Sequence, residues 1–302
     1  RARGAEMAVT ITSTADKEVS VILANANKDS EIMKGEGDGQ RNKIFAVYNV
    51  KAKINYPKSS IKWIKCDLRN EKAVNKLTKG MDIVIQGAAT TTGSKDVINQ
   101  PFVHVTDNAV MNAYLFRSCY LNKVKQLVFL GSSCVYPRDC KQPIKESYLL
   151  QSEIEKTNEP YAIAKIAGVK MCEAYNKQHK LNYISLMPTN LYGPNDNYDL
   201  NTSHFYPALI SKIYKANKNN KKDIIVWGNG KPKRELMYVD DLASACEFFL
   251  KKKTKHTLIN IGSGEEKSII EYANLIMKKL NIKLKIKFDK SKPNGTIRKV
   301  LN

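Results

Sequence analysis

Three side chains in the middle of the chain have the types and spacing needed to pass a proton to a carbonyl oxygen. Tyr161 and Lys165 stand four residues apart in a segment with a helical pattern, so they share one face of the expected helix. There the lysine ammonium can lower the phenol pKa from its ordinary value of about 10, which makes the phenol a usable proton donor and acceptor. Ser132, at the end of an expected strand, can give the same oxygen a second hydrogen bond. This set predicts carbonyl reduction by a nicotinamide cofactor.

A tyrosine and a lysine at this spacing also arise by chance, and Lys165 is then an ordinary exposed helix residue. Two flanking features favour the chemical interpretation: Ser132 lies upstream, and Pro188, Thr189 and Asn190 form a turn downstream. In that setting Lys165 has a second task, because its three donors can hold the ribose hydroxyls of the nicotinamide. We therefore predict oxidoreductase chemistry on this helix.

The elements that position these residues alternate along the chain, as expected of βαβ units around a parallel sheet. The predicted strands are 43–50, 61–68, 82–88, 126–132, 182–187 and a return strand at 258–262. The predicted helices are 71–79, 104–121, 161–179, 204–215, 239–252 and 267–280. Ligands in such sheets bind beyond the carboxyl ends of the strands, where Ala88, Ser132 and Pro188 fall. The prediction is an α/β fold with a doubly wound parallel sheet.

Composition limits the kind of protein. The chain of 302 residues is 42% hydrophobic, enough for a buried core, and no apolar run reaches the roughly 18 residues that would span a bilayer. The first residues contain no signal-peptide core. The six cysteines form no Cys-x-x-Cys pair, which argues against a zinc site and against a disulfide framework. We expect a cytoplasmic protein with reduced thiols and no membrane contact.

The formal net charge of +21 raises the question of nucleic-acid binding, because a basic surface attracts phosphate. The lysines are spread along the chain, and local runs such as 218–222 and 251–253 lack interleaved aromatic residues. A solvated lysine-rich surface is the simpler interpretation, so no nucleic-acid partner is expected. A positive field would still favour small, multiply anionic ligands.

Longer motifs around these residues carry a family resemblance. They are SSCVYP at 132–137, TNEPYAIAKIAGVKMCEAY at 157–175, MPTNLYGPNDN at 187–197, NTSHFYPALI at 201–210, VWGNGKPKRE at 226–235 and VDDLASA at 239–245. In order and separation, from about Gly87 to the chain end, they resemble the GDP-L-fucose synthase family of extended short-chain dehydrogenases. The resemblance implies a Rossmann-like domain at 1–190, rejoined by about 235–262, and a smaller substrate-binding lobe at 191–302.

The resemblance also implies a reaction. Its substrate would be GDP-4-dehydro-6-deoxy-D-mannose, epimerised at C3 and C5 and then reduced at C4 with NADPH. The C4 ketone acidifies the flanking protons, and epimerisation needs a base on one face and an acid on the other. Cys134 and His204 stand where the family carries that role, and Ser132, Tyr161 and Lys165 would serve the reduction. Family members pair through two long helices per subunit, so a homodimer is expected through 104–121 and 161–179.

Without the resemblance, Cys134 is a small buried hydrophobe at a strand end, and His204 is a first-turn helix residue behind a Ser203 cap. The remaining histidines are predicted at the surface or at helix ends: His104, His179 and His256. Three further cysteines are predicted to be structural: Cys140, Cys172 and Cys246. No group of histidines and carboxylates has metal-ligand spacing, so no metal is expected.

Two sets of ligand residues follow from the strand ends and the resemblance. The cofactor set is Asp67, Leu68, Ala88, Ala89, Leu130, Gly131, Ser132, Ser133, Lys165, Pro188, Thr189, Asn190, Leu191 and His204. The substrate set is Lys212, Trp227, Arg234, Asn294 and Lys299. Arginine offers a fork to a diphosphate and tryptophan a flat apolar wall, whereas the structural alternatives are a surface ion pair and a core tryptophan. Asn294 replaces an aspartate common in the family, which could weaken a contact to sugar or base hydroxyls.

The first forty residues do not match the family. A dinucleotide-binding fold should open with a strand and a GxxGxxG turn, whose glycines let the backbone approach the pyrophosphate. If 8–12 is that strand, Ser13, Asp16 and Val19 occupy the glycine-like positions, and an aspartate there would repel phosphate. The glycines of 35–39 precede the next strand and are better interpreted as a linker. The chain also starts at arginine and stops where relatives continue, so altered or cut ends are expected.

The cofactor preference and the activity leave alternatives open. Asn49, Lys51 and Lys53 follow the second expected strand, where an acidic residue would favour NAD, so NADP is preferred. One alternative activity is another nucleotide-sugar epimerase or reductase with the same Ser, Tyr and Lys set. The other is a nucleotide-sugar-binding protein without turnover, because the glycine-rich cofactor loop is missing.

Overall fold

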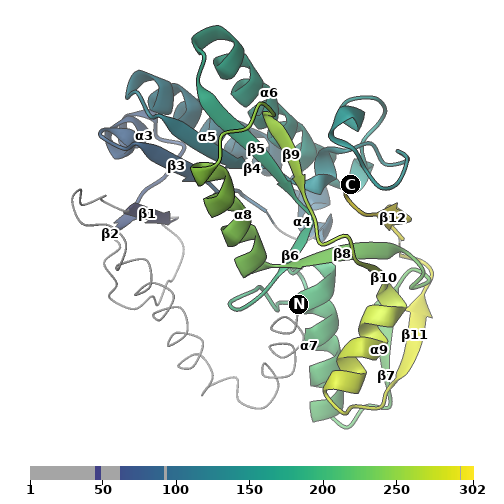
Figure 1. Ribbon diagram of the computed structural model, residues 1–302. Helices are drawn as coiled ribbons and strands as arrows, with labels where there is room; N and C mark the ends of the chain where they lie inside the picture. Colours follow the sequence, from purple (N-terminus) through teal and green to yellow (C-terminus); the bar gives the residue numbers. More distant parts are fainter. Residues whose placement is uncertain (1–44, 49–61, 92–93, 293) are drawn as a thin grey trace. The chain divides into compact units, whose positions relative to one another are not determined.

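The computed structural model describes residues 45–48, 62–91, 94–292 and 294–302. The chain separates into two units, residues 1–68 and 69–302. In the first unit, β1 (Phe45–Tyr48) and β2 (Lys62–Lys65) pair in parallel (Figure 1). The unmatched first forty residues lie outside the described residues, as do Asn49, Lys51 and Lys53. The expectations about a phosphate loop, a linker and the residues that favour NADP therefore remain predictions.

A parallel sheet forms the centre of the second unit. Its strands are β3 (Ile83–Gln86), β4 (Gln126–Leu130), β5 (Asn182–Pro188) and β9 (Leu258–Ile261), in the order β3-β4-β5-β9. All three pairings are parallel, so the carboxyl ends of the strands meet at one edge. This sheet confirms the predicted α/β fold, and the predicted return strand is β9, beside β5.

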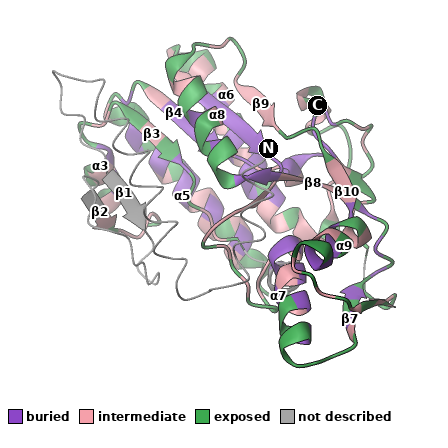
Figure 2. Cartoon of the chain, turned by 60° about the horizontal axis from the view of Figure 1, so that its bottom comes forward, coloured by how far each residue is buried: buried purple, intermediate pink, exposed green. Residues whose placement is uncertain are grey.

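Helices cover both faces of this sheet. On one face α5 (Pro101–Leu121) and α6 (Glu159–His179) pack together, and Phe116 of α5 meets Phe129 of β4 edge to face with ring centroids 5.5 Å apart. On the other face α8 (Val239–Lys251) packs on Val128, which points away from Phe129 because side chains alternate along a strand. The outward side of α8 is exposed, whereas buried residues follow the central strands (Figure 2).

Close packing of α6 on the sheet depends on Gly168. A Cβ atom at this position would collide with the ring of Phe129. The helix begins with Glu159 and Pro160, and proline suits the first turn because it has no N–H to leave unpaired. These two features place the first turn of α6, which carries Tyr161, beside the carboxyl end of β4.

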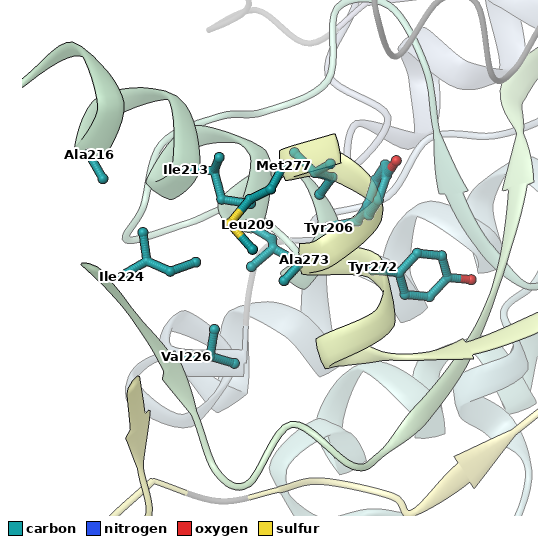
Figure 3. Packing of buried hydrophobic residues seen from close by; sticks show 10 residues of the cluster. Tyr206, Leu209, Ile213, Ala216, Ile224, Val226, Tyr272, Ala273 and Met277 are labelled. Atoms are coloured by element: carbon teal, nitrogen blue, oxygen red, sulfur yellow. The ribbon is translucent and has the colours of Figure 1, made fainter. Parts of the chain in front are cut away.

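A separate hydrophobic core lies among elements of the C-terminal third of the chain. It joins α7 (Phe205–Lys218), β7 (Asp223–Trp227), α9 (Ile269–Lys279) and β11 (Lys285–Asp289), and β7 pairs with β11 in parallel. Figure 3 shows its side chains converging between α7, α9 and β7. The labelled residues are Tyr206, Leu209, Ile213, Ala216, Ile224, Val226, Tyr272, Ala273 and Met277. The predicted domain boundary near residue 190 remains a prediction.

A second sheet connects the two cores. Its strands are β6 (Asn190–Tyr192), β8 (Lys233–Tyr238), β10 (Glu266–Ser268) and β12 (Arg298–Lys299), and each of the other three pairs with β8. On β8, Glu235 is fully buried and accepts hydrogen bonds from the backbone N–H of Gly264 at 2.6 Å and of Leu301 at 2.9 Å. Hydrogen bonds to a charged group contribute about 1.5–3 kcal/mol each. Glu235 therefore fixes the C-terminal residues against β8.

Each predicted helix is present with its ends shifted by at most a few residues, the first of them as α3 (Glu71–Thr78), but the structure also contains α4 (Ser94–Asn99), which was not predicted. The helix predicted to start at residue 104 begins at Pro101, so His104 lies inside its first turn. His104 is fully buried, with Nδ1 3.3 Å from the carbonyl oxygen of Thr90, so of its two predicted places the helix end is confirmed and the surface is wrong. Within the described residues, no helix has both the length and the apolar character that crossing a membrane requires.

Candidate active site

The turn after β4 carries two of the predicted reactive residues. Gly131 donates its N–H to the carbonyl oxygen of Leu186 at 2.8 Å, and a Cβ atom at 131 would collide with Met187. This close approach fixes the point at which the chain leaves the sheet. Next, Ser132 Oγ accepts a hydrogen bond from the N–H of Cys134 at 3.2 Å. Ser132 thereby caps a short helix and places Cys134 just beyond the carboxyl edge of the sheet.

Lys165 comes to the same edge from the first turns of α6. The residue is only 2% exposed, and its Nζ donates to the carbonyl oxygen of Leu130 at 2.7 Å. The same Nζ lies 5.6 Å from the ring centroid of Tyr161. Burial lowers the pKa of Lys165 to about 8, because an ammonium is poorly solvated in the protein interior. At neutral pH Lys165 remains mostly protonated, beside the phenol.

The phenol of Tyr161 does not behave as the sequence predicted. Its pKa is raised, first by burial and then by the negative charge of a nearby Cys134, although hydrogen bonds with Thr91 and Ser132 oppose the rise. The prediction that Lys165 lowers this pKa is wrong here, because its ammonium is directed to the Leu130 carbonyl oxygen. The phenol therefore keeps its proton at neutral pH, the form needed to protonate an alkoxide.

Cys134 has a cationic partner from a distant part of the chain. Lys299 Nζ on β12 donates to Cys134 Sγ at 3.2 Å. Burial alone would raise the thiol pKa, but the Lys299 charge and hydrogen bonds with Ser132, Lys299 and Asn158 lower it below its ordinary value. The thiol is therefore poised to act as a base, unlike an inert core cysteine.

A second cation stands next to Lys299. Arg234 on β8 is directly paired with Lys299 on β12 in the parallel ladder, and it is partly buried. Burial lowers the pKa of Arg234, while the negative charges of Cys134 and Glu155 oppose that change. The structure therefore brings Ser132, Cys134, Tyr161, Arg234 and Lys299 into one group.

Other predicted substrate residues gather around Trp227 at the end of β7. This tryptophan is 49% exposed, so the core-residue alternative is wrong. Lys212 Nζ lies 5.7 Å from the ring centroid and donates to the Ile225 carbonyl oxygen at 3.1 Å, and Lys292 Nζ lies 5.8 Å from the ring. Asn294 Oδ1 accepts from the N–H of Asn229 at 2.8 Å. Here the asparagine shapes the turn after Trp227, with its carbonyl already in use.

His204 stands apart from the group around Cys134. It is the N-cap residue of α7, although its side chain makes no capping bond, and it is exposed. The expected Ser203 cap is wrong, because helix α7 starts one residue later and Ser203 Oγ is buried without a hydrogen-bond partner. The surrounding protein shields the imidazole from water, and this desolvation lowers the pKa of His204. The negative charge of Asp196 opposes the change. In the described chain His204 interacts with Asp196 and Ala208, not with the Cys134 group.

The predicted cofactor residues divide into three groups. Ala88, Leu130 and Gly131 lie at the carboxyl edge of the sheet, where Ala88 is exposed and small enough to admit a dinucleotide. Ala89 and Ser133 follow the same strands, and Pro188 is the buried last residue of β5. Thr189 and Asn190 donate instead to the carbonyl oxygen of Glu235, at 3.1 and 3.0 Å, and Leu191 lies within β6.

Asp67 and Leu68 end the first unit, so their predicted contact with adenine remains a prediction. The residues at this edge fit a nicotinamide cofactor. Small exposed residues, Gly87 and Ala88, directly follow β3, and the Lys165 ammonium is held at the end of β4. Among the described residues, no histidines, cysteines and carboxylates are grouped as metal ligands.

Sequence reasoning missed two polar neighbours of the reactive residues. Thr91 hydrogen-bonds to Tyr161, and Asn158 hydrogen-bonds to Cys134. Thr91 follows β3 at the carboxyl edge, the rule that selected Ala88, and Asn158 directly precedes α6 without capping it. Asn108 of α5 holds the Thr91 loop by accepting from the N–H of Thr90 at 2.8 Å. The position of Thr91 after the end of a strand could therefore have identified it as a site residue.

The chain is similar to known proteins over most of its length. The model of the NAD dependent epimerase/dehydratase family matches residues 23–262. The GDP-L-fucose synthase of Sinorhizobium fredii (strain NBRC 101917 / NGR234) is 45% identical over 240 residues, which cover 79% of this chain and 76% of that protein. The GDP-L-fucose synthase of Escherichia coli (strain K12) is 43% identical over 231 residues, 74% of this chain and 72% of that protein.

A solved structure of a GDP-L-fucose synthetase from Naegleria fowleri bound to NADP is similar in fold. Its TM-score is 0.70 at 29% sequence identity, and the match covers 80% of this chain and 77% of that one. The sequence matches and the structural match thus each cover about three quarters or more of the chain.

Proposed function

We propose a reaction for this chain on the premise that it belongs to the NAD dependent epimerase/dehydratase family. Its activity is that of a GDP-L-fucose synthase, which converts GDP-4-dehydro-6-deoxy-D-mannose to GDP-L-fucose by 3,5-epimerisation and 4-reduction. The relatives of that name support the assignment. The observation that carries it is that a base and an acid lie close together. The Cys134 thiol has a lowered pKa, which suits it to removing a carbon-bound proton, and it lies within electrostatic range of the protonated Tyr161 phenol.

The proposed roles follow from the state of each group. Cys134 removes a proton next to the C4 ketone, and His204 supplies one from the opposite face once substrate lies between them. Tyr161 then protonates the C4 oxygen, and Ser132 donates a hydrogen bond to the same oxygen. Lys165 keeps a positive charge beside the phenol at neutral pH.

The cofactor is NADP, as expected from the relative solved with NADP. When bound, NADPH supplies hydride to C4. Lys165 and the edge residues Ala88, Leu130 and Gly131 are the described residues proposed to hold it. Trp227, Lys212 and Arg234 are proposed to bind the GDP moiety, because an exposed aromatic face and two cations suit a purine and a diphosphate.

NADPH oxidation by the purified chain tests this function directly. GDP-4-dehydro-6-deoxy-D-mannose should be consumed with equimolar NADPH, and GDP-L-fucose should be the product by NMR. Faster turnover of a different 4-keto nucleotide sugar would favour another epimerase or reductase of the family. Measurable binding of the GDP-sugar without NADPH binding or turnover would instead support a binding protein.

We further propose a cytoplasmic homodimer that pairs through α5 and α6. These helices expose large apolar side chains, with Phe102 at 69%, Leu121 at 54% and Ile163 at 46% exposure. All six cysteines are free, which suits a reducing compartment. Light scattering should give a molar mass about twice the chain mass of 34.1 kDa. The double substitution Phe102→Glu and Ile163→Glu should lower the measured mass to that of a single chain. A monomer in the unmodified protein would contradict the dimer.

A further inference from the structure

We infer that Lys299 is a positioning residue that ion-pairs with Cys134 and keeps its sulfur in the thiolate form. The sequence placed Lys299 among the substrate ligands, near the chain end and 165 positions from Cys134. In the structure its Nζ is 3.2 Å from the sulfur, within hydrogen-bonding distance for this pair. The inference rests on the proposed function, since it names the group that prepares the epimerisation base.

The strand that carries Lys299 is held in a fixed position. Ile144 donates its N–H to the Val300 carbonyl oxygen at 2.8 Å, Val300 donates to Gln142 Oε1 at 3.0 Å, and Leu301 donates to the buried Glu235 at 2.9 Å. Val300 and Leu301 are each 5% exposed. The segment 142–144 and Glu235 of β8 therefore secure the strand that carries Lys299, so its ammonium meets the sulfur at little further entropic cost.

In the part of the chain that the structure describes, Lys299 is the charged group whose hydrogen bond reaches the sulfur. Arg234, paired with Lys299 across β8 and β12, adds positive charge, and Glu155 near Arg234 partly offsets it. From α6 the neutral phenol of Tyr161 faces the sulfur, and Ser132 and Asn158 contribute hydrogen bonds.

Cys140 provides a natural comparison. It also lies within the field of Lys299, but burial raises its pKa overall. The difference lies in contact: Cys134 accepts a hydrogen bond from the ammonium, whereas Cys140 feels only its charge at longer range. An opposite charge within about 4–6 Å typically changes a pKa by 1–3 units, so this contact can decide which thiol is ionised at neutral pH.

The proposed proton transfer from the substrate carbon to Cys134 conserves atoms and charge. The substrate C–H bond breaks, an S–H bond forms at Cys134, and the electron pair moves to the ketone oxygen. The Lys299 side chain takes no part in the proton transfer and loses its ionic partner when the sulfur is protonated. It is then free to interact with the negative charge that develops on the substrate.

The test is the pH dependence of carbamidomethylation by iodoacetamide, measured at each cysteine by peptide mass spectrometry. In the unmodified protein, Cys134 should reach half-maximal rate at a lower pH than Cys140. Lys299→Met should raise the Cys134 midpoint by about one pH unit or more and slow labelling at pH 7 about tenfold. Lys299→Arg should restore most of the rate.

Arg298→Met is the matched control, because Arg298 lies on the same strand and pairs with Glu266 at 2.8 Å instead of Cys134. It should leave the Cys134 midpoint unchanged. The buried Cys119 and Cys172 report unfolding, since they should stay unlabelled in every folded variant. Lys299→Gln offers a second neutral replacement if the methionine variant unfolds.

Three results would overturn the inference: a Cys134 midpoint no lower than that of Cys140, an unchanged midpoint in a folded neutral variant, or an equal shift in Arg298→Met. If a neutral variant raised only the KM for the GDP-sugar, Lys299 would be a substrate-binding residue, as the sequence predicted, and the inference would also be wrong. Because thiol labelling needs neither substrate nor turnover, the three labelling outcomes are independent of whether the proposed reaction is correct.

Discussion

Replacement of Cys134 by serine is expected to slow epimerisation by about 10² to 10⁴-fold, the usual contribution of a positioned base. A serine hydroxyl cannot be ionised by Lys299 near neutral pH, since its pKa lies far above that of a thiol. Reduction of a ketone that is already epimerised should change little, because Ser132, Tyr161 and Lys165 are retained. Deuterium incorporation from D2O at C3 and C5, followed by mass spectrometry, measures the first step separately from NADPH oxidation.

Cys140→Ser makes the same chemical change at a thiol whose pKa is raised by burial. It should leave deuterium incorporation close to that of the unmodified protein. If Cys134→Ser slowed deuterium incorporation and reduction equally, the proposed division of roles between Cys134 and Tyr161 would be wrong.

Tyr161→Phe is expected to slow reduction by about 10² to 10⁴-fold while deuterium incorporation at C3 and C5 continues. The change removes a phenol that keeps its proton because of burial and the negative charge of Cys134. NADPH oxidation in a single turnover measures the chemical step, and fluorescence titration should show that NADPH still binds, since Lys165 remains in place.

Tyr175→Phe removes a phenol from the same helix, where its ring packs against Tyr120 and His179 away from the sulfur. Its reduction rate should match that of the unmodified protein. Normal reduction by Tyr161→Phe would show that another group, such as Thr91 or Ser132, delivers the proton.

Much of the fold could be predicted because hydrophobic periodicity is a local property. The strands at β4 and β5 and the helices at α5, α6 and α8 were found within a few residues of their ends. The burial of His104 was missed because one polar residue on a helix gives no sign of which neighbour will cover it. That histidine is buried by the Thr90 loop, an element 14 positions earlier in the chain.

The protonation states could not be read from spacing alone. Four residues of separation correctly put Lys165 beside Tyr161, yet the ammonium is directed to Leu130 and the phenol pKa rises. Spacing sets which side chains can be neighbours, whereas burial and the direction of each hydrogen bond set the sign of the pKa shift.

The sequence by itself determined the alternating α/β pattern, the strand-end position of Ser132 and Cys134, and the shared helical face of Tyr161 and Lys165. Each of these depends on residues close together in the chain. Only the tertiary structure decided that Lys299 would be the partner of Cys134, since that contact joins residues 165 positions apart. Such a contact exists because β12 is paired with β8 and held by Glu235, and no local pattern encodes that pairing.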